Sequence, residues 1–302
     1  MNDLSSYKRT IVTQDGEDGI IEVIFERLKV SGGWCVEFGA WDGEHLSNTW
    51  NLWHNRGWKA LLIEGDPHKF EQLRANTRDF PAVACLCRWV SHEGPDRLDD
   101  LLEGAEVPKD FDLLSIDVDG DDYHIWKSLV RFEPKLVVIE YNQTFPPHIE
   151  LIDPVGERNF GSSARATTNL ARQKGYCVVC CTGTNLFFVR RDLLGLLEVP
   201  EADLEDAFPA ERLAYLTSSM TGRAFLTGGD TFCSTGTLTG IAKQTLSLRM
   251  PESSHELHPV LVIDLRFLRR ILPFLEPIVS FVRALHLGRK RLVRRIRGER
   301  MP

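Results

Sequence analysis

Apolar residues near the start of the chain recur with helical spacing, and further along they gather into short runs. Over residues 17–29, five apolar side chains share one helix face: Ile20, Ile21, Ile24, Phe25 and Leu28. Gly32 and Gly33 then end the pattern. The spacing predicts an amphipathic helix that leads into the first strand.

Five apolar runs follow this helix, and helical patterns separate them. The predicted strands span residues 34–38, 58–63, 82–90, 111–116 and 135–139. Helices are expected between them, over about 46–56, 67–76, 97–102 and 123–131. Strands that alternate with helices at this spacing are typical of βαβ units, so we expect a parallel sheet with right-handed crossovers.

A stretch rich in Pro and Gly over residues 143–162 interrupts the alternation and is longer than a simple connection needs. After a predicted helix over 163–174, apolar runs at 176–181 and 186–190 flank a Thr-Gly-Thr-Asn turn, which is the pattern of an antiparallel hairpin. The predicted fold is therefore a Rossmann-like α/β domain. Its seven-stranded sheet is mostly parallel, with the antiparallel hairpin at its C-terminal end.

From about residue 192 the alternation stops, and the pattern divides the chain into four parts. These are an N-terminal lid and helix (1–33), the α/β domain (34–191), an irregular segment (192–260) and a basic amphipathic tail (261–302). The tail carries eleven Lys and Arg against three acidic residues, whereas the whole chain has a net charge of -7, so the remainder carries -15. So acidic a remainder disfavours specific nucleic-acid binding and suits a small-molecule or glycan acceptor.

The basic tail has two interpretations. Between residues 265 and 297, bulky apolar residues alternate with arginines, which suits peripheral contact with an anionic membrane or a partner helix. The alternative is a solvated tail. The sequence shows neither an apolar stretch of about twenty residues nor a secretory signal, and its seven cysteines are an odd number, so a cytoplasmic location is expected. The oligomeric state is left open.

The first strand ends in a glycine-containing turn with an acidic residue. Glu37, Gly39 and Gly43 stand between the strand and the following predicted helix, where glycines allow the backbone to approach a ligand. A carboxylate is a poor neighbour for the pyrophosphate of a dinucleotide, but it suits the cationic S-adenosylmethionine (SAM). Glu64, at the end of the second strand, is placed to accept hydrogen bonds from the ribose of an adenosine cofactor.

Three segments carry a resemblance to a known family: Val36-Glu37-Phe-Gly39-Ala40, Leu62-Ile-Glu64-Gly-Asp66-Pro67 and Asp112-Leu-Leu-Ser-Ile-Asp117-Val-Asp119-Gly120. Through them residues 13–190, about three fifths of the chain, resemble the FkbM-type SAM-dependent methyltransferases, which are class I methyltransferases. The resemblance implies that Glu37 and Gly39 line the methionine part of SAM, that Glu64 binds the ribose and that Asp117 lies at the mouth of the pocket. The predicted cofactor-binding residues are Glu37, Gly39, Ala40, Trp41, Gly43, Glu64, Asp66 and Asp117.

This sequence departs from the family at residues 117–122, where relatives have an Asp followed by a single Glu-Gly, and the departure leaves the catalytic group open. Asp117, Glu140 and Asn142 end neighbouring strands, and their oxygens suit Mg²⁺. The alternative is that Asp117 caps a helix or orders the cofactor, while Asp121 and Asp122 are solvated residues in the first turn of that helix. Asp117, Asp119 and His124 are the candidate catalytic residues, with His124 as a metal-free general base or, equally, an exposed helix residue.

Residues 14–18, ahead of the first helix, are predicted either to fold over the cofactor as a lid or to cap that helix. The function predicted is SAM-dependent O-methylation of a hydroxyl on a sugar, glycan or polyketide-like metabolite. The rivals are a catalytically silent adaptor recruited through the basic tail and a dinucleotide-dependent oxidoreductase. Nucleic-acid methylation is disfavoured because the region of the candidate catalytic residues is acidic.

Overall fold

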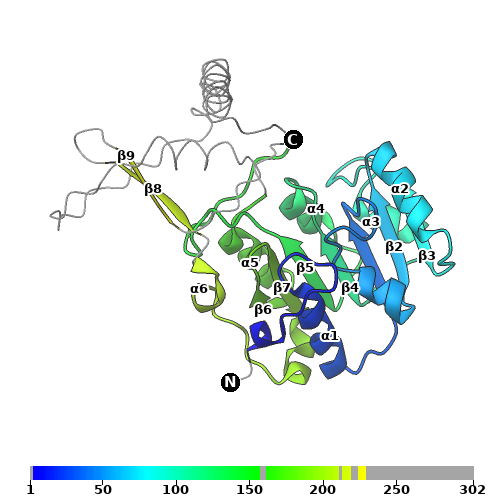
Figure 1. Ribbon diagram of the computed structural model, residues 1–302, viewed down its shortest axis with the longest axis horizontal. Helices are drawn as coiled ribbons and strands as arrows, with labels where there is room; N and C mark the ends of the chain where they lie inside the picture. The colour runs from blue at the N-terminus through cyan, green and yellow to red at the C-terminus, as the bar shows by residue number, and fades with distance from the viewer. Residues whose placement is uncertain (1–2, 157–160, 211–212, 219–223, 229–302) are drawn as a thin grey trace, which may run out of the picture. The chain divides into compact units, whose positions relative to one another are not determined.

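The computed structural model describes residues 3–156, 161–210, 213–218 and 224–228, with backbone only for the last two strands (Figure 1). Its main feature is a seven-stranded sheet with the strand order β3-β2-β1-β4-β5-β7-β6. The strands are β1 (Trp34–Phe38), β2 (Lys59–Glu64), β3 (Val83–Cys87), β4 (Leu113–Ile116), β5 (Leu136–Glu140), β6 (Tyr176–Cys181) and β7 (Asn185–Arg190). The first five are parallel, and β7 runs antiparallel to both β5 and β6. This confirms the predicted Rossmann-like fold class and its closing hairpin.

Helices cover both faces of the sheet. The helices α3 (Leu98–Gly104), α4 (Asp122–Ser128) and α5 (Ala164–Gln173) pack their apolar side chains on one face, around the fully buried Trp126. The other face is covered by α1 (Glu17–Arg27), α2 (Pro67–Thr77) and the short helix Asn51–Asn55, with Phe25 and Trp53 among the buried residues. Apart from residues at their ends, the strands β1, β2 and β4 to β7 are buried on both faces, as expected for a covered sheet, whereas the edge strand β3 is only half-buried.

The helix predicted over residues 46–56 is wrong in its first half. Residues 41–49 form successive turns, and the helical segment is a single π-helical stretch, Asn51–Asn55. Leu46 lies in the left-handed region with φ of 56°. The physical reason is that residues 47–49 wrap around the buried carboxylate of Glu37 and donate hydrogen bonds to it, which a regular helix would not allow.

The N-terminal segment is fastened to the start of α1. One carboxylate oxygen of the buried Asp18 accepts hydrogen bonds from the backbone N–H groups of Ile11, Val12 and Thr13 and from the Thr13 hydroxyl. The buried Glu17 accepts hydrogen bonds from Thr182 and Asn185 in the β6–β7 hairpin. Residues 14–18 are therefore tied to the carboxyl-terminal edge of the sheet, beside the start of β7.

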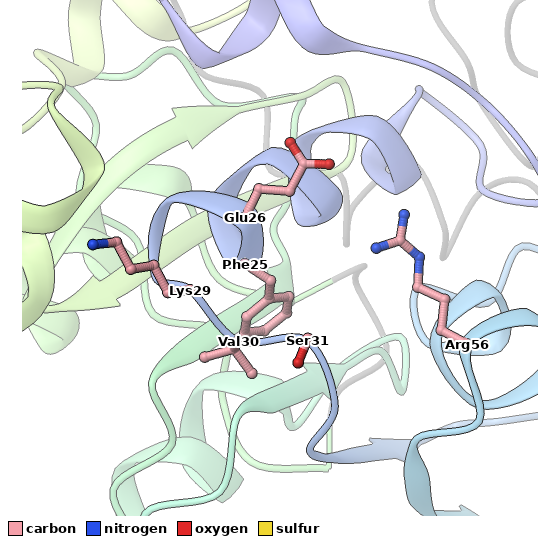
Figure 2. A pocket seen from close by; sticks show the side chains of 6 residues that line it. All are labelled: Phe25, Glu26, Lys29, Val30, Ser31 and Arg56. Atoms are coloured by element: carbon pink, nitrogen blue, oxygen red, sulfur yellow. The ribbon is translucent and has the colours of Figure 1, made fainter.

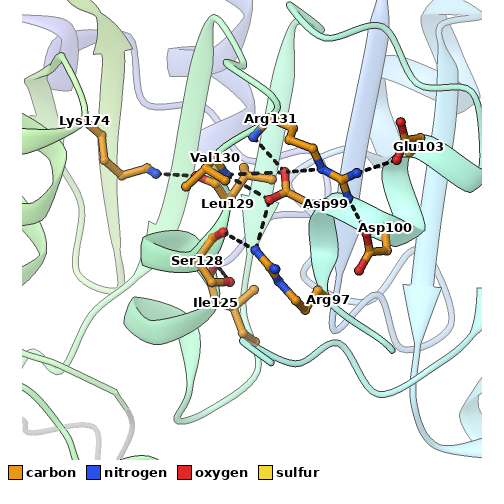
Figure 3. Close-up of polar contacts among 10 residues, drawn as sticks. All are labelled: Arg97, Asp99, Asp100, Glu103, Ile125, Ser128, Leu129, Val130, Arg131 and Lys174. Carbon is orange, nitrogen blue, oxygen red and sulfur yellow. Dashed lines mark hydrogen bonds and ion pairs between the residues drawn. The ribbon is translucent and has the colours of Figure 1, made fainter. Parts of the chain in front are cut away.

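A charged network joins α3 to the chain after α4 (Figure 3). Asp99 is almost completely buried and accepts hydrogen bonds from the backbone N–H groups of Val130 and Arg131, at 3.1 and 2.9 Å. The guanidinium groups of Arg97 and Arg131 lie 3.4 and 3.8 Å from the same carboxylate. The ion pairs compensate the buried charge.

Beyond the hairpin, the chain forms the 3-10 helix Arg191–Leu197 and the short α6 (Leu204–Ala207). The strands β8 (Ala214–Ser218) and β9 (Ala224–Gly228) form a separate two-stranded sheet. The predicted basic tail over 261–302 lies outside the described residues. Within the described part of the chain, no helix has both the length and the apolar composition required to cross a membrane.

Candidate functional site

Four acidic side chains line the carboxyl-terminal edge of the sheet. Glu64 ends β2, Glu37 stands one residue before the end of β1, Asp117 follows β4 and Glu140 ends β5. The registers pair Glu37 with Leu62 on one side and with Ser115 on the other, and side chains alternate along a strand. The four carboxyl groups therefore project on the same face of adjacent strands β2, β1, β4 and β5.

The carboxylate of Glu37 is held by the protein itself. It accepts hydrogen bonds from the hydroxyls of Ser47 (2.5 Å), Thr49 (2.7 Å) and Ser115 (3.1 Å) and from the backbone N–H of Asn48 (2.9 Å). Burial raises the pKa of Glu37, and these hydrogen bonds oppose the rise. Four hydrogen bonds fill the acceptor capacity of a carboxylate, so Glu37 shapes the turn, and its predicted contact with the cofactor stays a prediction.

The backbone of the first turn is also engaged within the protein. The N–H groups of Gly39 and Ala40 both donate to the carbonyl of Ile63, and that of Gly43 donates to the carbonyl of Ala40. Gly39 has φ of 79°, and a Cβ there would lie 1.7 Å from the carbonyl oxygen of Asp117. Because these donors are used and residues 44–49 form turns, the described turn lacks the helix N-terminus that a pyrophosphate requires. This geometry disfavours a dinucleotide.

Glu64 is buried yet only partly engaged by the described residues. One carboxylate oxygen accepts the N–H of Trp41 at 2.8 Å and the other accepts the N–H of Asp66 at 2.7 Å. Each oxygen therefore keeps a second lone pair, which is what two adjacent ribose hydroxyls would use. The Asp66 carboxylate itself caps α2 by accepting the N–H groups of His68 and Lys69, which lower the pKa of Asp66.

Two exposed tryptophans flank Glu64. Trp41 has φ of 47°, is 41% exposed, and its ring centre lies 4.0 Å from the Lys69 ammonium. Trp89, which follows β3, is 62% exposed and packs against Gly65, where a Cβ would lie 2.3 Å from the indole. The sequence reasoning missed Trp89, because its contact with the end of β2 depends on the pairing of β2 with β3.

The acidic groups at the ends of β4 and β5 form a close cluster. Single carboxylate oxygens of Asp117, Asp119 and Glu140 all lie within 4.8 Å of one another. Desolvation by the surrounding protein, and then the charges of Asp122 and Asp119, raise the pKa of Asp117 to about 8, although its side chain is exposed at this edge. Burial, followed by the charge of Asp117, raises the pKa of Glu140 well above its usual value. Oε2 of Glu140 is buried and has no hydrogen-bond partner among the described residues.

Asp122 is buried, contrary to the view of it as a solvated first-turn residue. Its carboxylate accepts the N–H groups of Val118 at 2.8 Å and Gly120 at 2.9 Å, and so holds the connection between β4 and α4. Burial raises the pKa of Asp122 to about 6, although the hydrogen bonds oppose the rise. Asp119 adopts φ of 58° within this connection. Residues 117–122 thus form a tightly turned loop that brings Asp119 to the cluster.

The predicted metal-binding group is only partly assembled. Asp117 and Glu140 lie together, but Oδ1 of Asn142 accepts hydrogen bonds from the N–H of Thr144 (3.0 Å) and its hydroxyl (2.5 Å). An amide oxygen with two such partners has no remaining lone pair for a cation. The structure therefore brings Asp119, rather than Asn142, to the two predicted carboxylates.

His124, the predicted general base, contacts the backbone of the loop that follows β5. Its Nε2 lies 2.7 Å from the carbonyl oxygen of Asp153. Since a carbonyl can only accept, Nε2 carries the proton and only Nδ1 can act as a base. His124 thus fastens the loop after β5 to α4, and its catalytic role stays a prediction.

The hollow shown in Figure 2 lies away from these carboxylates. It has a volume of about 400 Å³ and is lined by Phe25, Glu26, Lys29, Val30, Ser31 and Arg56. These residues precede β1 and β2, so the hollow lies toward the amino-terminal edge of the sheet. Ligands of parallel α/β sheets bind at the opposite edge. We therefore place the candidate site at the carboxylates.

No protein-family model matches the chain, and no curated protein matches it by sequence. Several solved structures are similar to it. TrmK of M. capricolum, solved with S-adenosyl-homocysteine, is 11% identical, with 55% of this chain and 67% of that one covered and a TM-score of 0.34. A TehB-like SAM-dependent methyltransferase from Corynebacterium glutamicum is 14% identical, with 62% and 92% covered and a TM-score of 0.37. A precorrin-6y C5,15-methyltransferase from Geobacter metallireducens is 14% identical, with 60% and 90% covered and a TM-score of 0.35. Scores this low assign no activity to this chain.

Proposed function

We propose that this protein is a SAM-dependent methyltransferase that acts on a hydroxyl group. The observation that carries the proposal is Glu64, whose buried carboxylate stands at the end of β2 with one lone pair remaining on each oxygen. Two neighbouring ribose hydroxyls match that pair of acceptors. In the turn beside it, the backbone N–H groups are already bonded within the protein and the neighbouring side chains are acidic. Both properties favour the cationic SAM over a pyrophosphate.

The residues around Glu64 suit the rest of the cofactor. Trp89 presents a largely exposed indole beside Gly65, and an adenine ring can pack on such a surface. Gly39 allows β1 and the end of β4 to approach closely, which brings Asp117 next to the first turn. SAM, when bound, supplies a methyl group on a sulfonium, and the protein's task is to place an acceptor oxygen in line with it.

The pair formed by Asp117 and Glu140 is the proposed proton acceptor. A general base works best when its pKa lies near the working pH, and both carboxyl groups have raised pKa values. In this proposal the Asp117–Glu140 pair would accept the hydroxyl proton as the acceptor oxygen bonds to the methyl carbon, and the bond from that carbon to the sulfonium sulfur would break to leave S-adenosylhomocysteine. The alternative is that Asp117, Asp119 and Glu140 hold Mg²⁺, since three carboxylates suit a hard cation and a cation relieves their repulsion. With a metal, the acceptor hydroxyl would be acidified directly.

Calorimetric titration with SAM and with S-adenosylhomocysteine tests the proposal. Saturable binding of both is expected, and well-folded protein that binds neither overturns it. Transfer of labelled methyl groups to a panel of hydroxylated acceptors, with and without a chelator, then separates the two versions of the chemistry. Loss of transfer on chelation, restored by Mg²⁺, supports the metal, whereas chelator-resistant transfer supports the proton-accepting pair. Binding without any transfer would favour the silent adaptor.

A further inference from the structure

We infer that residues 146–156, after β5, form the acceptor-binding surface and that the acceptor is an uncharged hydroxyl compound with an apolar body. The inference rests on the proposed function and names its substrate class. Three large apolar side chains of this segment are exposed: Ile149 (38%), Ile152 (43%) and Val155 (52%). Exposed apolar side chains gathered in one segment mark a binding surface more often than isolated ones do.

Although these apolar side chains are exposed, the backbone of the segment is firmly attached to the rest of the fold. On the α5 side, the Ser163 hydroxyl accepts the N–H of Leu151 at 2.9 Å and donates to the carbonyl of Ile149 at 2.7 Å. The Ser162 hydroxyl accepts the N–H of Asp153, and Arg165 donates to the carbonyl of Pro147. The backbone polar groups are thus bound inward, while the isoleucine side chains are left outward.

The same segment is fastened to the first turn of α4, directly after the acidic cluster. The Asp121 carboxylate accepts the N–H of Gly156 at 2.9 Å, and His124 donates to the carbonyl of Asp153. Asp122, which follows Asp121, accepts the hydrogen bonds that hold the loop carrying Asp119. One turn of helix therefore ties the apolar segment to the proposed proton acceptor.

The charge of this region selects the acceptor further. Asp117, Asp119 and Glu140 lie together, and the exposed side chain between Ile149 and Ile152 that can carry a charge is Glu150. An anionic acceptor would be repelled by these groups. The apolar body of such an acceptor would cover the exposed isoleucines, and its neutral hydroxyl would not be repelled by the acidic edge.

The test compares octyl β-glucoside with methyl β-glucoside, since the two share their hydroxyl groups and differ only in the alkyl chain. Binding to the protein with S-adenosylhomocysteine present is measured by calorimetry below the micelle concentration. We expect octyl β-glucoside to bind at least about tenfold more tightly, because covering a couple of its additional methylene groups is enough for that ratio. Octanoate, which has a similar chain but a negative charge, should bind more weakly than 1-octanol.

Two variants connect the preference to the segment. The double substitution Ile152→Ser with Val155→Ser should bring the ratio of the two glucosides close to one. Leu196→Ser removes a similarly exposed side chain from the 3-10 helix Arg191–Leu197 and should leave the ratio unchanged. Equal binding of the two glucosides to the native protein, or an unchanged ratio in the double variant, overturns the inference. The glucoside ratio can also be measured without S-adenosylhomocysteine, so the two failures can be told apart. Failure of SAM to bind would reject the proposed function, whatever the glucoside ratio is.

Discussion

Removal of the Glu64 carboxylate is the most direct perturbation of the proposed cofactor site. In the native protein this carboxylate accepts two backbone N–H groups, from Trp41 and Asp66, and its two remaining lone pairs are proposed to accept the ribose hydroxyls. Hydrogen bonds to a charged group are each worth about 1.5–3 kcal/mol. Glu64→Ala should therefore weaken SAM binding by about 3–6 kcal/mol, which is at least about a hundredfold in Kd.

The same substitution also affects the fold. It leaves two backbone N–H groups without their acceptor, at about 1–3 kcal/mol each where water cannot reach them. Thermal unfolding without ligand measures this loss, while calorimetric titration well below the melting temperature measures Kd. Glu64→Gln, which keeps the shape and one acceptor oxygen, should retain more stability than Glu64→Ala but still bind SAM weakly.

Glu71→Ala is the matched control, because Glu71 is a solvent-exposed carboxylate on α2, the helix that follows Glu64. It should change neither the melting temperature nor the Kd appreciably. A Glu64→Gln protein that is folded and binds SAM as tightly as the native protein would refute the assignment of Glu64 to the ribose. A lowered melting temperature alone would leave Glu64 with a purely structural role and would refute it equally.

Three further predictions concern the fold and the cluster. Gly39→Ala should prevent folding or cost several kcal/mol in urea unfolding, because its Cβ would overlap a carbonyl oxygen, whereas Gly57→Ala, also at positive φ but in open space, should cost about 1–2 kcal/mol. Asp99→Ala should cost about 3 kcal/mol, since it leaves buried backbone donors without their acceptor and removes one partner of Arg97 and Arg131, whereas Asp100→Ala at the surface should cost about 0–1 kcal/mol. A raised pKa means that the folded state holds its proton longer, so the contribution of the Asp117–Glu140 pair to stability should fall as the pH rises from about 4 towards 8, and Glu140→Gln should reduce the fall in melting temperature over that range relative to the native protein.

The strands of the sheet could be predicted because each is a nearly continuous apolar run, and their boundaries fall within three residues of those expected. The sequence failed where a local pattern was overridden by a distant group. Residues 47–49 read as part of a helix, but their donors are needed by Glu37, a residue about ten positions away whose charge is buried. Helical spacing carries no information about that requirement.

In the candidate site too, some features follow from the local sequence pattern and others depend on contacts between distant residues. The positions of Glu37, Glu64, Asp117 and Glu140 at one edge follow from strand ends and alternation, so the pattern predicted them together. The engagement of Asn142 could also have been noticed, since an Asn whose side chain accepts the N–H two residues on is a common turn. By contrast, the contact of Trp89 with Gly65 joins two strands and depends on their register.

The carboxylates differ in how many hydrogen bonds the protein donates to them, and this difference separates their proposed roles. Glu37 has four hydrogen bonds from described residues and Glu64 has two, whereas the Glu140 carboxyl shares a hydrogen bond with Asp117 and keeps one buried oxygen, Oε2, without a partner among them. A buried oxygen without a partner is costly, so it is retained where a ligand, a proton or a cation completes it. Glu37→Gln should thus act mainly on stability, Glu64→Gln on the Kd for SAM, and Glu140→Gln on the turnover rate and its pH profile. Measuring all three quantities for the three variants tests the separation, and a Glu140→Gln protein with native turnover at every pH would remove Glu140 from the chemistry.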